Sequence, residues 1–200
     1  MRYPFVRPRK HNYAYKIARE NTRKAIHSYL ENRKVKLAKL LVAPSGTNAD
    51  QDILEGFAKE VYAIDIAQKA IDKCSDFINK KLGDVRKNGY ESNYFDAAAS
   101  FLFFHHLHKV GFEPYLMELH RIIKREGLLF ILEPGNLYPI SWVMSFGRKI
   151  FGNISGLVPD EAPIYPPQFT NALIISGFKV EMLQGVSFSH VRIPLPLQNL

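Results

Sequence analysis

The residues of chemical interest follow short aliphatic runs, at points where a buried strand would end. A turn, Ala43-Pro44-Ser45-Gly46-Thr47-Asn48, closes the run Leu37 to Ala43, and Asp65 closes the run Val61 to Ile64. Asp65 stands about 20 residues after Gly46, the offset at which a carboxylate accepts from both hydroxyls of a ribose. The pattern predicts a nucleoside site, although a strand-end aspartate is also a common helix N-cap.

A third acidic residue follows the next run. Asp84 closes Lys81-Leu82-Gly83, where a carboxylate could accept from the exocyclic amine of adenine. A dinucleotide cofactor is the rival ligand, and it needs the pattern G-x-G-x-x-G around its pyrophosphate. Only Gly46 is present here, and Asp50 lies close behind it, which is unfavourable beside a diphosphate. The sequence therefore favours a nucleoside ligand without phosphate.

Strands and helices must alternate to bring these turns to one edge of a sheet. Continuous aliphatic runs are typical of parallel strands buried on both faces, and helical spacing of apolar residues separates them. This alternation of strands and helices predicts a doubly wound α/β fold. In such a fold, ligands bind at the carboxyl ends of the strands. The expected strands are 37–43, 61–65, 81–85, 95–101 and 128–133, followed by an antiparallel hairpin of 179–183 and 186–193. The expected helices hold residues 14–30, 53–57, 67–78, 116–123 and 169–176.

Composition limits the class of protein. The 200 residues are 46% hydrophobic and 23% charged, as in an ordinary globular domain, so we expect one domain over 1–200. Cys74 is the only cysteine, which excludes an internal disulfide and a multi-cysteine zinc site, and its helical spacing predicts a core thiol. We see no secretory signal and no membrane-length apolar run, so we expect a cytoplasmic protein that binds no metal.

The charge is basic. Lysine and arginine number 27 against 19 acidic residues, giving a net charge of +8, and part of the excess falls in an N-terminal helical segment, 1–36. This balance raises the chance of an anionic partner such as nucleic acid or a membrane surface, although a solvated surface is the simpler explanation, because charge alone points only weakly to nucleic acid.

As a set, the motifs resemble those of the class I S-adenosylmethionine (SAM)-dependent methyltransferases of the small-molecule type, including those of types 11 and 25. The glycine-rich first motif is similar to Leu40 to Asn48, the acidic second motif to Val61 to Ile66, and the third to Gly83 to Val85. The fourth resembles Tyr94 to Leu107, and the segment Glu118 to Phe130 is also similar. The resemblance implies a Rossmann-like, mostly parallel seven-stranded sheet and SAM as cofactor, with S-adenosylhomocysteine as product. Residues implied to bind it are Ala43, Pro44, Ser45, Gly46, Thr47, Asn48, Asp65, Ile66, Asp84, Val85, Ser100 and Phe101.

The first motif departs from the family pattern at three positions. Val42 stands where an acidic residue is usual, and Pro44 and Asn48 stand where glycines are usual. Pro44 also removes one backbone donor from the turn. A catalytically degenerate relative that keeps the fold is therefore an alternative to an active enzyme.

The resemblance implies in-line transfer of an activated methyl group, for which the protein mainly aligns the acceptor. His105 is the candidate general base, although a packed or capping histidine is the alternative. We expect the insert 134–167 to form a lid over a small, hydrophobic or lipid-like acceptor, with possible contact to a membrane surface. The candidate acceptor or lid residues are Tyr13, Tyr15, His106, Glu133, Trp142 and Phe146.

An RNA methyltransferase is the main alternative, since it would use the basic surface. Enzymes of this fold that methylate exocyclic amines commonly carry an Asn/Asp-Pro-Pro-aromatic run after the fourth strand, whereas here that place reads Ser100-Phe101-Leu102-Phe103. A small-molecule acceptor is therefore the primary expectation, and the oligomeric state stays open.

Overall fold

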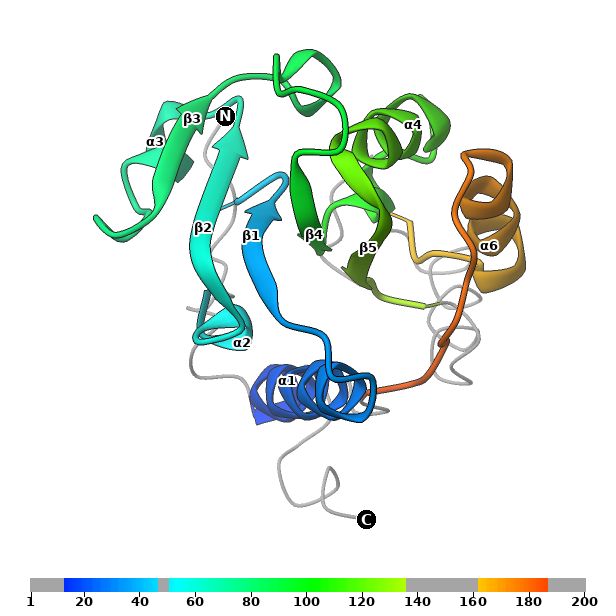
Figure 1. The fold of residues 1–200 in the computed structure, drawn as a ribbon. Helices are drawn as coiled ribbons and strands as arrows, with labels where there is room; N and C mark the ends of the chain where they lie inside the picture. Colours follow the sequence, from blue (N-terminus) through cyan, green and yellow to red (C-terminus); the bar gives the residue numbers. More distant parts are fainter. Residues whose placement is uncertain (1–12, 47–50, 136–161, 187–200) are drawn as a thin grey trace.

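The sheet has five parallel strands among the residues that the computed structural model describes, which are 13–46, 51–135 and 162–186. Their spatial order is β3-β2-β1-β4-β5, as Figure 1 shows. The order reverses between β1 and β4, and in sheets of this type ligands bind in a crevice at the carboxyl ends of the strands beside such a reversal. The doubly wound α/β fold is confirmed. The strands are β1 (Leu37–Val42), β2 (Ala58–Asp65), β3 (Asn79–Leu82), β4 (Phe95–Phe101) and β5 (Ile123–Leu132).

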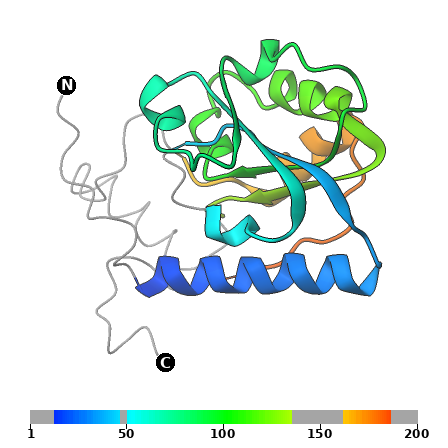
Figure 2. The ribbon, with the colours of Figure 1, turned by 60° about the vertical axis from the view of Figure 1, so that its left-hand side comes forward.

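Helices cover both faces of the sheet. The long helix α1 lies across one face, and α4 and α6 lie on the other (Figures 1 and 2). Ile26 and Leu30 of α1 pack with Leu40 of β1 in one core cluster, whereas Leu41 packs with Leu116 of α4 in the other. The helices are α1 (Tyr13–Asn32), α2 (Gln51–Leu54), α3 (Gln68–Ile71), α4 (Glu113–Ile122) and α6 (Pro166–Ile175), with short 3-10 turns η2 (Val85–Lys87) and η3 (Phe104–His106).

The amino end of the sheet is tied together by one carboxylate. Asp96 of β4 accepts hydrogen bonds from the N–H groups of Ala38 and Lys39 at the start of β1, at 2.8 and 2.7 Å. It also accepts from Lys124 of β5 at 2.6 Å. Asp96 therefore fixes three neighbouring strands relative to one another at the end remote from the crevice.

Helix and strand limits differ from the sequence prediction in several places. The helices expected over 53–57 and 67–78 are single turns, α2 and α3, and β3 begins at Asn79 rather than residue 81. β5 begins at Ile123 instead of 128, because α4 passes directly into it and residues 124–127 form an irregularity in its pairing with β4. Gly127 permits this close packing, since a Cβ there would lie 2.7 Å from the backbone oxygen of Asp96.

The expected count of seven strands is wrong for the described residues. Residues 179–183 have no regular structure there, and only Val186 of the second expected hairpin strand is described. Instead of pairing in the sheet, this segment contacts α1: Tyr29 donates to Glu181 at 2.7 Å, and Asn21 donates to the carbonyl of Val186 at 2.8 Å. Within the described ranges, no helix is both long and apolar enough to cross a membrane.

Candidate functional site

The turn after β1 and the end of β2 are joined by the Asp65 carboxylate. One oxygen of Asp65 accepts from the N–H of Gly46, and the other accepts from the N–H of Ala67, each at 2.8 Å. The N–H of Ser45 donates to the carbonyl of Ile64 at 2.9 Å. Gly46 has φ of +55°, a left-handed conformation that suits glycine. The carboxylate thus sets the path of the turn, and each oxygen keeps a further lone pair for a ligand hydroxyl.

The immediate surroundings of Asp65 are mixed in polarity. Asp65 is only 7% exposed, whereas its neighbour Ile66 is 75% exposed. A large apolar side chain so exposed next to a buried carboxylate offers a surface for the flat face of a base. The turn after β1 also holds a cis peptide bond between Ala43 and Pro44.

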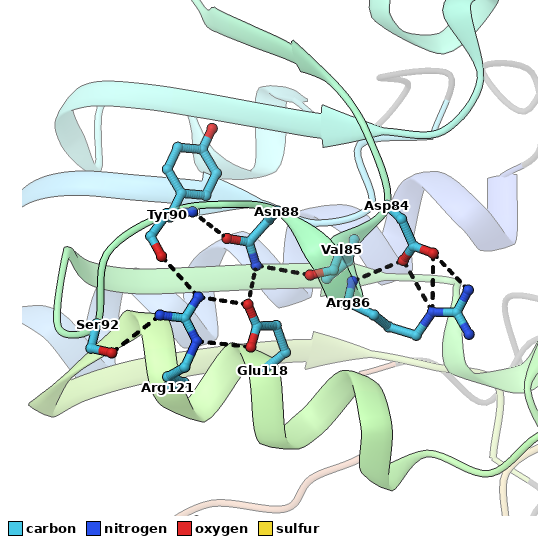
Figure 3. Close-up of polar contacts among 8 residues, drawn as sticks. All are labelled: Asp84, Val85, Arg86, Asn88, Tyr90, Ser92, Glu118 and Arg121. Atoms are coloured by element: carbon cyan, nitrogen blue, oxygen red, sulfur yellow. Dashed lines mark hydrogen bonds and ion pairs between the residues drawn. The ribbon is translucent and has the colours of Figure 1, made fainter.

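The end of β3 carries a salt bridge that the sequence prediction missed. Asp84 accepts from the N–H of Arg86 at 2.8 Å, and the Arg86 guanidinium donates to both carboxylate oxygens, from Nε at 3.1 Å and from Nη2 at 2.6 Å (Figure 3). The guanidinium holds the pKa of Asp84 below its ordinary value. The expected acceptor for an adenine amine is therefore already bonded. The sequence did contain a signal for this salt bridge, because Arg86 stands two residues after Asp84.

The loop after η2 is clamped to α4. The buried Asn88 amide donates to the carbonyl of Val85 and to Glu118 of α4, both at 2.8 Å. Arg121 pairs with Glu118 through Nε at 2.9 Å and reaches the carbonyl of Tyr90 at 2.8 Å (Figure 3). This clamp fixes the loop that carries Val85, itself buried, beside Asp84.

Ser100 and Phe101 at the end of β4 differ in what their side chains contact. Ser100 is fully buried, and its hydroxyl has no hydrogen-bond partner among the residues that the structure describes. Phe101 packs into the core cluster that includes Leu30 of α1. Since buried hydroxyls are normally bonded, Ser100 can offer a hydrogen bond to a ligand, whereas the Phe101 side chain belongs to the core.

A histidine and a carboxylate meet where β4 and β5 end. Glu133 accepts from the N–H groups of Phe103 and Phe104 at 2.7 and 2.6 Å, and from that of His105 at 3.3 Å. Its other contact is Nδ1 of the His105 ring at 2.8 Å. The side chains of Glu133 and His105 are 6% and 12% exposed. Glu133 thus orients His105 rather than facing an acceptor freely, a link that sequence spacing could not reveal.

The described residues that flank 136–161 lie beside this pair. The carbonyl of His105 accepts from the N–H of Ala162 at 3.1 Å, and Gly135 forms a parallel bridge with Ile164. His106 is exposed, and its ring centroid lies 4.0 Å from that of His105. The predicted site residues Thr47, Asn48, Trp142 and Phe146, and the side chains of Tyr13 and Tyr15, lie outside what the structure describes.

The single thiol is a core group, as its spacing predicted. Cys74 is 4% exposed, and its sulfur lies 3.8 Å from the Ser45 hydroxyl. Burial raises the pKa of the Cys74 thiol, which lowers its reactivity. Over the described ranges, no three His, Cys, Asp or Glu side chains gather as a metal site.

The described residues fit the adenosine part of SAM. Asp65 has lone pairs for ribose hydroxyls, Ile66 offers an apolar surface, and Ser100 has an unused hydroxyl. These groups come from the ends of β2 and β4, on either side of β1. Asp84 fits less simply, because both of its oxygens already accept hydrogen bonds from Arg86.

The family model for the methyltransferase domain matches residues 42–131. No curated protein sequence matches the chain.

Solved structures share the fold at low identity. A SAM-dependent methyltransferase from Thermotoga maritima, a possible histamine N-methyltransferase, is 12% identical with a TM-score of 0.62, covering 82% of this chain and 73% of that chain. A putative methyltransferase in complex with the activator Trm112, from Haloferax volcanii, is 12% identical with a TM-score of 0.53, covering 80% and 75%. The methyltransferase CalH, solved with S-adenosylhomocysteine, is 17% identical with a TM-score of 0.55, covering 82% and 51%. Residues 42–131 thus match a methyltransferase domain, and the chain shares the Rossmann-like fold of class I SAM-dependent methyltransferases.

Proposed function

We propose that this methyltransferase acts on a small, apolar acceptor that carries a protic oxygen or nitrogen, and that His105 takes the proton. The observation that carries the proposal is the bond of 2.8 Å between His105 Nδ1 and the buried Glu133 carboxylate. SAM supplies a methyl group already activated on a sulfonium, so the chain's own task is to align the acceptor and remove a proton where the acceptor needs it.

The Glu133 contact supports a base role for the ring. A carboxylate at Nδ1 favours the tautomer with the proton on that nitrogen, which leaves the lone pair of Nε2 to accept a proton. Glu133 also holds the backbone of Phe103 and Phe104, so it fixes both the ring and the turn that carries it. The proton of the acceptor then passes to Nε2 as the new bond to carbon forms.

The preference for an apolar acceptor rests on the side chains around the turn. The Phe103 ring lies 5.1 Å from Tyr115 and 5.4 Å from Phe104. The described residues on either side of 136–161 lie near this turn, since Ala162 donates to the carbonyl of His105 and Gly135 pairs with Ile164. We therefore propose that the lid of 134–167 covers the acceptor, with Trp142 and Phe146 against it, and that Tyr13, Tyr15 and His106 contribute to the same pocket.

The test is release of S-adenosylhomocysteine from SAM with a panel of acceptors. The panel holds small phenols, alcohols and amines, each with a short and a long alkyl chain, and carboxylates as acceptors that need no base. With a protic acceptor, His105→Gln should lower kcat by about 10²–10⁴-fold, the usual worth of a positioned base. His108→Gln, an exposed histidine nearby, is the control and should leave turnover unchanged. Equal turnover by wild type and His105→Gln would refute the base role.

RNA is the second candidate acceptor, and a surface feature favours it. Lys39 lies 3.8 Å from the Tyr94 ring centroid and Lys81 lies 4.4 Å from that of Tyr90, which adds positive charge to an aromatic face of a chain of net charge +8. Binding of generic single-stranded RNA that weakens steeply with salt would support this candidate. Domain extent over 1–200, a cytoplasmic location and contact with a membrane surface remain predictions from the sequence.

A further inference from the structure

We infer that Arg86 competes with the cofactor's adenine for Asp84, and so lowers the affinity of this chain for SAM and its discrimination between purine bases. The inference rests on the proposed position of the adenine at the end of β3. The conflict is visible in the structure, because the residue expected to accept from the adenine amine already accepts from an arginine (Figure 3).

Three N–H donors of Arg86 occupy both oxygens of Asp84. A carboxylate has about four lone-pair positions. One oxygen accepts from the backbone N–H and from Nε of Arg86, at 2.8 and 3.1 Å. The other accepts from Nε and Nη2, at 3.1 and 2.6 Å. The single Nε hydrogen is shared between the two oxygens, so an incoming amine competes with the guanidinium for the carboxylate, whereas the backbone bond can stay.

The displaced guanidinium has a second contact that it can keep. The Arg86 guanidinium carbon lies 5.1 Å from the ring centroid of Tyr115, within the range of a cation–π contact. Tyr115 belongs to α4, whose position is fixed by the Glu118 clamp to the loop after β3. Arg86 can thus pivot on Tyr115 and stay beside the purine instead of moving into solvent.

The exposure of the ion pair between Arg86 and Asp84 indicates that Arg86 competes only modestly with the adenine amine. The Arg86 and Asp84 side chains are 49% and 28% exposed, so water screens the pair. An exposed ion pair of this kind corresponds to about a two- to five-fold change in an equilibrium constant. Arg86 should therefore reduce cofactor affinity without abolishing it.

The chemistry also predicts an effect on base specificity. The 6-amino group of adenine donates to Asp84, whereas the 6-oxo group of hypoxanthine can only accept, and the Arg86 guanidinium can donate to it. Wild-type protein should therefore discriminate weakly between S-adenosylhomocysteine and S-inosylhomocysteine. Removal of Arg86 should free Asp84 for the amine and remove the donor for the 6-oxo group.

Calorimetric titration of the full chain with both compounds tests the inference. Arg86→Gln should bind S-adenosylhomocysteine about two- to five-fold more tightly than wild type, and S-inosylhomocysteine no more tightly. Lys87→Gln is the matched control, since it removes the same charge from the next residue, whose side chain forms no hydrogen bond with the Asp84 carboxylate, and it should leave both affinities unchanged. In an Asp84→Asn background, Arg86→Gln should no longer improve binding.

The outcomes separate this inference from the proposed function. If wild type binds S-adenosylhomocysteine and Arg86→Gln binds it equally or more weakly, Arg86 does not compete and the inference is wrong. If Lys87→Gln improves binding as much as Arg86→Gln, the effect is general charge, and the inference is again wrong. If folded wild type binds neither compound, the proposed cofactor site itself fails. Thermal unfolding of each variant verifies that it is folded.

Discussion

The carboxylate of Glu133, at the end of β5, lies 2.8 Å from Nδ1 of His105 in the turn after β4. The same carboxylate accepts from the N–H groups of Phe103 and Phe104. It therefore caps the start of the η3 turn. One side chain therefore joins two neighbouring strand ends and orients the candidate base. Under the proposed function, fold stability and catalysis are therefore coupled at this residue.

Glu133→Gln should both destabilise the fold and slow methyl transfer. The amide has only one oxygen to share between the backbone N–H groups and the ring, so we expect a loss of about 1.5–3 kcal/mol in the free energy of unfolding. Urea unfolding measures this loss, and kcat with a protic acceptor measures the second effect. Glu126→Gln, an exposed residue of the same strand, is the control. A Glu133→Gln variant as stable and active as wild type would contradict the account.

Asp96→Asn should remove stability that depends on pH. Burial opposes ionisation of Asp96, but bonds from Lys124 and from the N–H groups of Lys39 and Ala38 outweigh it and lower the pKa. A lowered pKa means that the stabilisation is present above the unfolded pKa, near 3.8, and is lost as the pH falls through the folded pKa.

Urea unfolding at several pH values measures the effect of this substitution. Near pH 6, Asp96→Asn should be less stable than wild type by about 1–3 kcal/mol, and the difference should shrink below pH 4. Asp76→Asn, whose side chain is fully exposed, should show almost no difference at either pH. A difference that stays constant down to pH 2 would mean that ionisation of Asp96 does not stabilise the fold.

The clamp between the loop after β3 and α4 should depend on the Asn88 amide. Asn88 is 1% exposed, and its removal takes away the side-chain donor to the carbonyl of Val85 and one of the two donors to Oε1 of Glu118, which keeps its bond from Arg121. We expect Asn88→Ala to cost about 1–3 kcal/mol in the free energy of unfolding. Asn171→Ala, at an exposed position of α6, is the control. Equal stability of both variants would show that the clamp is unimportant.

The sequence predicted the parts of the site that depend on the order of strands. Buried aliphatic runs identified β1, β2 and β4, and β4 has the bounds expected. Asp65 therefore fell at the end of its strand, next to the turn that carries Gly46. These features are local, since a short apolar run followed by a turn is read from neighbouring residues.

The sequence could not predict contacts between distant residues or the lengths of short helices. Glu133 and His105 are far apart along the chain and meet only because β4 and β5 are paired. The early start of β5 depends on how Gly127 packs against Asp96. Glu181 was expected in a strand, but its bond with Tyr29 of α1 keeps that segment out of the sheet. Contacts of this kind form only in the folded chain, so the spacing of apolar residues along the sequence does not predict them.

The most direct test of the central claim is the affinity of Asp65→Asn for S-adenosylhomocysteine, measured by calorimetry against wild type. The amide cannot accept from both ribose hydroxyls and from the N–H groups of Gly46 and Ala67, so we predict binding weaker by about 1–3 kcal/mol. Asp72→Asn, exposed in the same region, should bind as wild type does. Unchanged affinity of a folded Asp65→Asn variant, or wild-type binding of NAD in place of S-adenosylhomocysteine, would contradict the account.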